Sequence, residues 1–126
     1  RSRESLMGLT KVTVEVSNLA KAGRPYKNEF LVDTGAIDCL VPKSMLKKAG
    51  VKPEGKSVYM LADATPVEYE YGFARVSFMG SETVAQVIFG PDNAEPILGV
   101  VALENTGIGV DPRTNMLKKM VAKSLK

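Results

Sequence analysis

Residues 30–36 read Phe-Leu-Val-Asp-Thr-Gly-Ala, and the interpretation of the whole chain starts from this stretch. Three apolar residues lead into a tight turn that carries Asp33. Thr34 can hydrogen-bond locally, and Gly35 lets the backbone approach the carboxylate closely. A carboxylate at the end of a buried strand is typical of acid–base chemistry, because burial and neighbouring charges shift its protonation. From these residues alone, a plain Asx-turn in which Asp33 caps backbone amides explains the stretch about as well as an acid–base site does.

Composition narrows the chemistry further. The chain has 126 residues, no histidine and one cysteine, Cys39. Neither a Ser-His-Asp triad, nor a Cys-His pair, nor a histidine-based zinc site can be built from one copy. One cysteine also excludes an internal disulfide framework. The 14 Asp and Glu residues are therefore the best candidates for catalysis, and we expect neither a metal nor another cofactor.

The pattern around this stretch predicts a mainly β fold. Val12, Val14 and Val16 alternate with polar residues, as in a half-buried strand. Val58, Met60 and Ala62 alternate in the same way. The apolar phase flips at Gly72, which predicts either a β-bulge or a strand that changes sheets. We expect a closed β-barrel or sandwich with one to three short helices, one of them between Pro42 and Gly50.

Domain organisation follows from length and from the chain ends. The length fits one domain, which we place at residues 8–126. Residues 1–7 are charged and read as a tag or a disordered N-terminus. No apolar run approaches the roughly 20 residues of a membrane helix, so we expect no membrane partner. The unpaired cysteine and the lack of a targeting signal favour the cytoplasm.

Three motifs follow one another along the chain. The first is Leu-Val-Asp-Thr-Gly-Ala at residues 31–36, and the second is a hairpin at residues 57–76 with Leu-Ala-Asp-Ala at its turn. The third is Pro-Ile-Leu-Gly at residues 96–99. In this order and spacing, the chain resembles the retropepsin-like aspartic proteases, which are single-domain, dimeric relatives of pepsin. The resemblance covers about residues 8–120.

The resemblance implies an aspartic endopeptidase that works as a homodimer on an extended polypeptide. Asp33 of each subunit would meet its counterpart at the two-fold axis, and the two carboxyl groups would share a proton. One would activate water while the other hydrogen-bonds the scissile carbonyl. Thr34 would hydrogen-bond across the dimer and hold the two loops together. Gly35 would accept a hydrogen bond from the substrate backbone. The hairpin would act as a flap over the substrate.

The same resemblance implies a set of residues that contact the substrate. They are Ala36 and Ile37 after the catalytic loop, Ala62, Asp63 and Ala64 at the flap tip, and Ile97 and Leu98 on the pocket floor. The chain departs from retroviral members at Ile37 and Val100, where an apolar pair replaces an ion pair. Ala64 stands where relatives often have glycine. Because alanine disfavours positive φ, we expect a different turn type there.

Two alternative functions stay open at this point. The first is a catalytically inactive retropepsin-like module for peptide binding or dimerisation. The second is a basic β-domain that binds nucleic acid, since the net charge is +3 and lysines gather at residues 43–56 and 118–126. These lysines lack interleaved aromatic residues, so solvated surfaces are the better interpretation and we expect no nucleic-acid partner. Glu68 and Glu70 could form a glycosidase pair, but exposed alternation on a hairpin explains them better.

Overall fold

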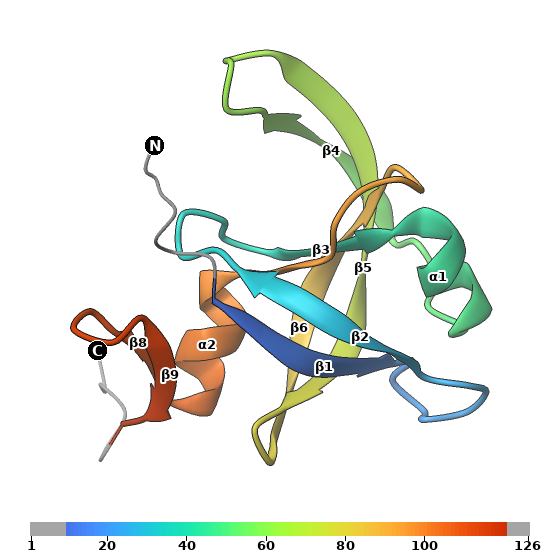
Figure 1. Ribbon diagram of the computed structural model, residues 1–126. Helices are drawn as coiled ribbons and strands as arrows, with labels where there is room; N and C mark the ends of the chain where they lie inside the picture. The colour runs from blue at the N-terminus through green and yellow to red at the C-terminus, as the bar shows by residue number, and fades with distance from the viewer. Residues whose placement is uncertain (1–9, 121–126) are drawn as a thin grey trace.

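The computed structural model describes residues 10–120 (Figure 1). Its strands are β1 (Lys11–Ser17), β2 (Tyr26–Val32), β3 (Cys39–Pro42), β4 (Gly55–Met60), β5 (Pro66–Phe78), β6 (Ser81–Gly90), β7 (Ile97–Leu98), β8 (Ile108–Asp111) and β9 (Met116–Lys119). Its helices are α1 (Lys43–Lys48) and α2 (Val100–Thr106). Residues 1–7, which we interpreted from the sequence as a tag or a disordered N-terminus, lie outside the described residues. Of the described helices, none has the length and apolar character needed to span a bilayer.

Six of the strands close into a barrel. The hydrogen-bonded order is β1-β2-β7-β3-β6-β5, and β5 also pairs with β1 to complete the circuit. Most neighbours are antiparallel, while β2 with β7 and β3 with β6 are parallel. Closure leaves no open sheet edge among these six strands. The predicted closed, mainly β fold with short helices is confirmed.

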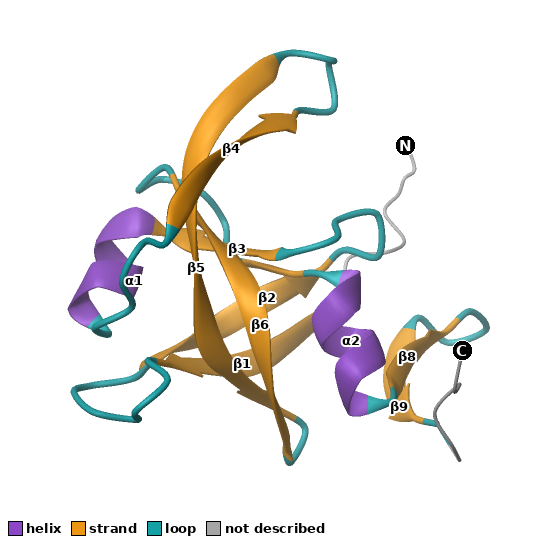
Figure 2. Ribbon diagram, turned by 180° about the vertical axis from the view of Figure 1, so that it is seen from behind, coloured by secondary structure: helices purple, strands orange, loops and turns teal. Residues whose placement is uncertain are grey.

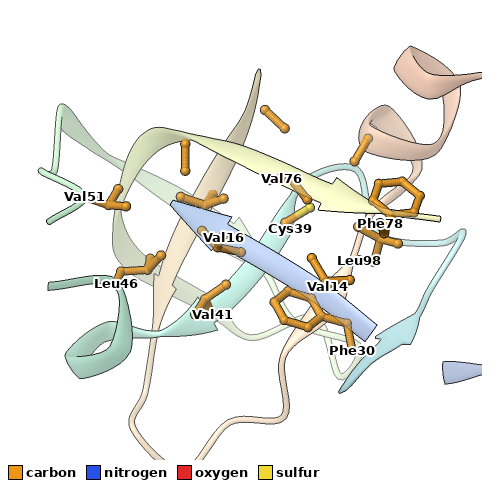
Figure 3. Close-up of a cluster of buried hydrophobic side chains, with 14 of the residues drawn as sticks. Val14, Val16, Phe30, Cys39, Val41, Leu46, Val51, Val76, Phe78 and Leu98 are labelled. Atoms are coloured by element: carbon orange, nitrogen blue, oxygen red, sulfur yellow. The ribbon is translucent and has the colours of Figure 1, made fainter. Parts of the chain in front are cut away.

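The barrel interior holds the hydrophobic core (Figure 3). Val14 and Val16 are fully buried while the residues between and beside them on β1 are exposed or partly exposed, as the alternation predicts. Phe30 on β2 and Val76 on β5 are also fully buried. Burying a side chain of this size stabilises the fold by about 1.5–3 kcal/mol. Phe30 lies three residues before Asp33, so the strand that leads into the turn at Asp33 is anchored in the core.

Gly72 marks the point where β5 changes its partners. The pairing of β5 with β4 ends at Tyr71, and its pairing with β6 begins at the same residue, without a bulge in either register. Strands β4 and β6 belong to the same seven-stranded sheet, so neither a bulge nor a change of sheet is observed, and the phase flips where the pairing with β4 ends and β5 enters the barrel. A Cβ atom on Gly72 would lie 2.5 Å from the carbonyl oxygen of Lys52. Glycine is needed here because the chain before β4 crosses directly beneath the strand.

In the part of the chain before Gly72, β4 and the first part of β5 form a two-stranded hairpin, which we call the arm (residues 55–71). The arm rises from the barrel at the end where the β2–β3 loop lies (Figures 1 and 2). The structure corrects the interpretation of its first strand. Val58 and Met60 are 65% and 68% exposed, whereas Ser57 and Tyr59 are partly buried. Because the arm stands away from the core, apolar alternation does not decide which of its faces is buried.

Two short helices and a second hairpin complete the fold. Helix α1 begins after Pro42 and buries Leu46, and the chain turns at Gly50 with φ +81°. This confirms the helix predicted between Pro42 and Gly50. Strands β8 and β9 pair with each other in a separate two-stranded sheet, which lies beside α2 in Figure 1. Met120 donates its backbone N–H to the carbonyl of Gly107 and so returns the chain to the end of α2.

Candidate active site

Asp33 follows the last residue of β2 and is held by three hydrogen bonds. Its backbone N–H donates to the carbonyl of Leu98 at 3.1 Å. Its carboxylate Oδ1 accepts the N–H of Gly35 at 2.9 Å. Its carbonyl accepts the N–H of Ala36 at 3.0 Å and closes the turn. The Asx-turn that the sequence left open as the alternative interpretation is therefore present, and it fixes the position of the half-buried Asp33 carboxylate.

The third sequence motif packs directly on this turn. Strands β2 and β7 run parallel, with Leu31 opposite Ile97 and Val32 opposite Leu98. The first two residues of α2 continue the contact, because Val100 donates its N–H to the carbonyl of Ala36 at 2.8 Å. The N–H of Val101 donates to the next carbonyl along the loop at 3.1 Å. Two segments more than 60 residues apart in sequence thus form one hydrogen-bonded unit around Asp33.

Gly99 makes this close contact possible. A Cβ atom at this position would lie 2.5 Å from the carbonyl oxygen of Asp38 and 2.7 Å from that of Ile37. Real Cβ atoms do not approach backbone oxygen this closely, so no residue larger than glycine fits without displacing the loop. Gly99 belongs to the third sequence motif, but its role as a spacer between α2 and the Asp33 loop becomes visible only in the structure.

The predicted site residues differ in how accessible they are. Thr34 and Gly35 are exposed, and Ala36 and Ile97 are partly buried. Ile37 is 67% exposed, so the apolar pair expected between Ile37 and Val100 leaves Ile37 largely uncovered in a single chain. Leu98 is fully buried in the core. Leu98 therefore corrects the prediction for the pocket floor, because a fully buried side chain has no surface to offer a substrate.

The tip of the arm is a tight turn that contains Ala62, Asp63 and Ala64. Leu61 donates its N–H to the carbonyl of Thr65 at 2.9 Å, and Ala64 donates its N–H to the carbonyl of Leu61 at 2.9 Å. Hydrogen bonds from the side chain and backbone of Thr65 lower the pKa of the Asp63 carboxyl. These hydrogen bonds are internal to the turn. The arm therefore presents an ordered tip without using contacts to the Asp33 loop.

Ala64 adopts φ +67°, contrary to the expectation that alanine would avoid this region. The hydrogen bonds of the turn evidently outweigh the local cost, which is about 1–2 kcal/mol for a residue with a Cβ atom.

Ala64→Gly is expected to stabilise the tip. Relief of the left-handed strain exceeds the added entropy of the unfolded chain by about 0.5 kcal/mol. Hydrogen exchange at the amide of Leu61, which donates to the Thr65 carbonyl, should slow by roughly 2-fold. Ala62→Gly is the matched control, since Ala62 lies in the same turn without positive φ. It should speed the exchange, and a faster exchange in Ala64→Gly would contradict this account of the turn.

Asp38 and Cys39 follow the Asp33 loop and enter β3. Burial raises the pKa of the Asp38 carboxyl. Burial also raises the pKa of the Cys39 thiol to about 11, and the negative charge of Asp38 adds to this, whereas a hydrogen bond from the Gly99 backbone opposes it. A neutral, buried thiol is a poor nucleophile. Cys39 therefore fits the interpretation as a small core residue better than that of a redox switch.

Two surface hollows lie away from Asp33. One, of about 310 Å³, lies between β1, β2 and the β5–β6 turn and includes Glu15, Lys27 and Glu82 in its lining. The other, of about 320 Å³, lies at the base of the arm and includes Lys43 and Glu70. Neither is lined by Asp33. Within residues 10–120, no cluster of three or more carboxylates and cysteines could hold a metal ion.

The chain matches a known protein family in sequence and several solved structures in fold. Residues 18–105 match the family described as gag-polyprotein putative aspartyl protease, so the chain belongs to that family. Comparison with curated proteins gave no match. Membership agrees with the retropepsin-like resemblance of the three motifs, and the matched residues include both the Asp33 turn and the Gly99 segment.

Solved structures confirm the retropepsin-like fold. The protease of EIAV, in complex with the inhibitor HBY-793, has a TM-score of 0.60 and 15% identity over 85% of this chain and 93% of that one. The retroviral protease-like domain of Ddi1 from Leishmania major has a TM-score of 0.51 and 19% identity over 90% of each chain. The foamy viral protease-reverse transcriptase, in complex with an RNA/DNA hybrid, has a TM-score of 0.56 and 19% identity over 76% of this chain. That match spans only 12% of the foamy viral chain.

Proposed function

We propose that the protein is an aspartic endopeptidase whose active site forms when two copies bring their Asp33 turns together. What carries this proposal is the hydrogen-bonded unit in which the Leu98 carbonyl and the Gly35 N–H hold Asp33 at the end of β2. The unit presents one carboxylate and an exposed Thr34 beside it. Chemistry that needs two carboxylates is incomplete in one copy, because the sequence has no second Asp-Thr-Gly.

The proposed chemistry uses the two carboxyl groups in different protonation states. Two like charges a few Å apart cannot both ionise readily, so the pair holds one proton between them. The ionised Asp33 accepts a proton from a water molecule, whose oxygen attacks the scissile carbonyl carbon. The protonated Asp33 hydrogen-bonds the carbonyl oxygen and stabilises the charge that develops there. Proton transfer to the amide nitrogen then releases the amine and restores the shared proton.

The arm supplies the second half of the proposed site as a flap. It rises on the same end of the barrel as the Asp33 turn (Figure 1) and is anchored at its base by the crossing of Gly72 over Lys52. An extended peptide lying between arm and turn could add backbone hydrogen bonds as a further strand does. The expected substrate is therefore an unfolded or extended segment of polypeptide, because a folded domain would not fit beneath a hairpin.

Cleavage of an unfolded protein at several pH values tests the proposal. We expect cleavage products from a reduced, denatured protein, with little cleavage of the same protein in its folded state. The pH profile should be bell-shaped, because both fully ionised and fully protonated pairs are inactive. Dilution of the enzyme should lower its activity per chain as dimers dissociate. Binding of peptides without any cleavage, in all these conditions, would point instead to an inactive binding module.

A further inference from the structure

Thr10 lies directly before β1 and beside the end of β2. Its backbone carbonyl accepts the N–H of Val32 at 2.8 Å, and Val32 is the residue before Asp33. On the other edge of the same strand end, the Leu98 carbonyl accepts the N–H of Asp33 at 3.1 Å. The strand end that carries Asp33 is therefore held from two sides, by β7 on one and by Thr10 on the other.

The side chain of Thr10 connects this edge to the hairpin of β8 and β9. Its hydroxyl Oγ1 donates a hydrogen bond to the backbone carbonyl of Asn115, in the turn between these two strands. The two residues are 105 positions apart in sequence, and the bond is partly buried. Thr10 thus joins two separate parts of the fold, with its carbonyl on β2 and its hydroxyl on the β8–β9 turn.

The turn that accepts this hydrogen bond is itself held in place. Asn115 donates its N–H to the carbonyl of Asp111 at 2.7 Å. The Asp111 carboxylate accepts the N–H of Arg113 at 2.9 Å. Asn115 has φ +57°, a left-handed conformation that asparagine tolerates better than most residues. The turn therefore offers Thr10 an acceptor in a fixed position, rather than a loop that could follow its movements.

We infer that Thr10 is a positioning residue for the proposed reaction, because it holds the strand end that carries Asp33. This inference rests on the proposed function and deepens it. Reacting groups must be held within about 0.5 Å of their productive geometry by the bonds that surround them. The hydroxyl bond to Asn115 keeps the Thr10 carbonyl against the Val32 N–H. The β8–β9 hairpin, which contains none of the predicted site residues, thereby supports the candidate active site through Thr10.

Thr10→Val tests this inference, because it removes the hydroxyl and keeps the backbone carbonyl and the shape of the side chain. Thr106→Val is the matched control. The Thr106 hydroxyl is also partly buried and donates to backbone carbonyls, those of Ala102 and Leu103, but it lies at the far end of α2 from the Asp33 loop. The two variants should lower the midpoint of thermal unfolding by similar amounts, since each loses a hydroxyl of the same kind.

Steady-state kinetics on a peptide substrate separate positioning from stability. Thr10→Val should lower kcat by about 10-fold, because Asp33 moves relative to the reacting atoms, and should leave KM within about 2-fold of the wild type. Thr106→Val should keep the wild-type kcat, and Thr10→Ser, which retains a hydroxyl, should recover most of it. A wild-type kcat in Thr10→Val would overturn the inference. So would an equal loss of kcat in Thr106→Val, or a Thr10→Ser variant as slow as Thr10→Val.

Absence of cleavage by the wild type would contradict the proposed function but still allow the role of Thr10 to be tested. Hydrogen exchange of backbone amides needs no catalysis. Two amides report on the support of Asp33, that of Val32, which donates to Thr10, and that of Gly35, which donates to the Asp33 carboxylate. Both should exchange about 5-fold faster in Thr10→Val than in Thr106→Val. Equal exchange in the two variants would show that the hydroxyl does not hold the Asp33 turn and would overturn the inference.

Discussion

Replacing Asp33 with Asn is expected to lower kcat/KM by about 10³-fold. The amide cannot accept a proton from water, and in a homodimer the change removes both carboxyl groups of the pair at once. The Asn Oδ1 can still accept the Gly35 N–H, which is 2.9 Å from the Asp33 oxygen. The midpoint of thermal unfolding should therefore stay within about 3 °C of the wild type. Steady-state kinetics on an unfolded protein, together with a thermal scan, measures both quantities.

Asp38→Asn is the matched control for this prediction. Asp38 belongs to the same loop, five residues further on, and it is partly buried as Asp33 is. If catalysis depends on Asp33 alone among the loop carboxylates, Asp38→Asn keeps activity within a few-fold of the wild type. An Asp38→Asn variant that is as inactive as Asp33→Asn would show that charge in the loop, rather than the proposed pair, sustains the activity.

Gly99→Ala is expected to destabilise the fold by about 3 kcal/mol, at the upper end of what overpacking costs. The new Cβ atom would lie 2.5 Å from the Asp38 carbonyl oxygen and 2.6 Å from the carbon that bears it. Both are backbone atoms, so relief requires the Asp33 loop and the start of α2 to move apart. The thermal midpoint should fall by roughly 10 °C, and activity should fall with it because the turn that positions Asp33 is displaced.

Gly109→Ala gives the corresponding control within a strand. A Cβ atom there meets the Met120 sulfur at 3.3 Å, and that flexible side chain can move away. Its cost should stay below about 1 kcal/mol. Denaturant unfolding of the two variants compares these values directly. A Gly99→Ala variant as stable as Gly109→Ala would mean that the loop and α2 have more freedom than the close contact at Gly99 implies.

The barrel and the Asp33 turn could be predicted because several local signals agreed. The alternation of Val14 and Val16 with polar residues is decided by the core, so the sequence pattern and the observed burial coincide. The turn at Asp33 follows from Asx and glycine chemistry, which acts between adjacent residues. The order of the three motifs then indicated the family.

The errors fall where long-range geometry decides. The arm extends beyond the core, so the alternation at Val58 and Met60 gave the wrong buried face. Ala64 takes a positive φ because the turn's own hydrogen bonds impose it, against the preference of alanine. Leu98 belongs to the core rather than to the pocket, since the parallel pairing of β2 with β7 turns its side chain inward.

Mixing wild-type chains with Asp33→Asn chains tests most directly whether two copies share one active site. After equal amounts have exchanged subunits, about one quarter of the dimers contain two Asp33 carboxyl groups. Twice as many chains are then present, so total activity should fall to about half that of the wild-type chains before mixing. Activity that stays at its starting value after full exchange would show that each Asp33 works without the other, and would contradict the shared site.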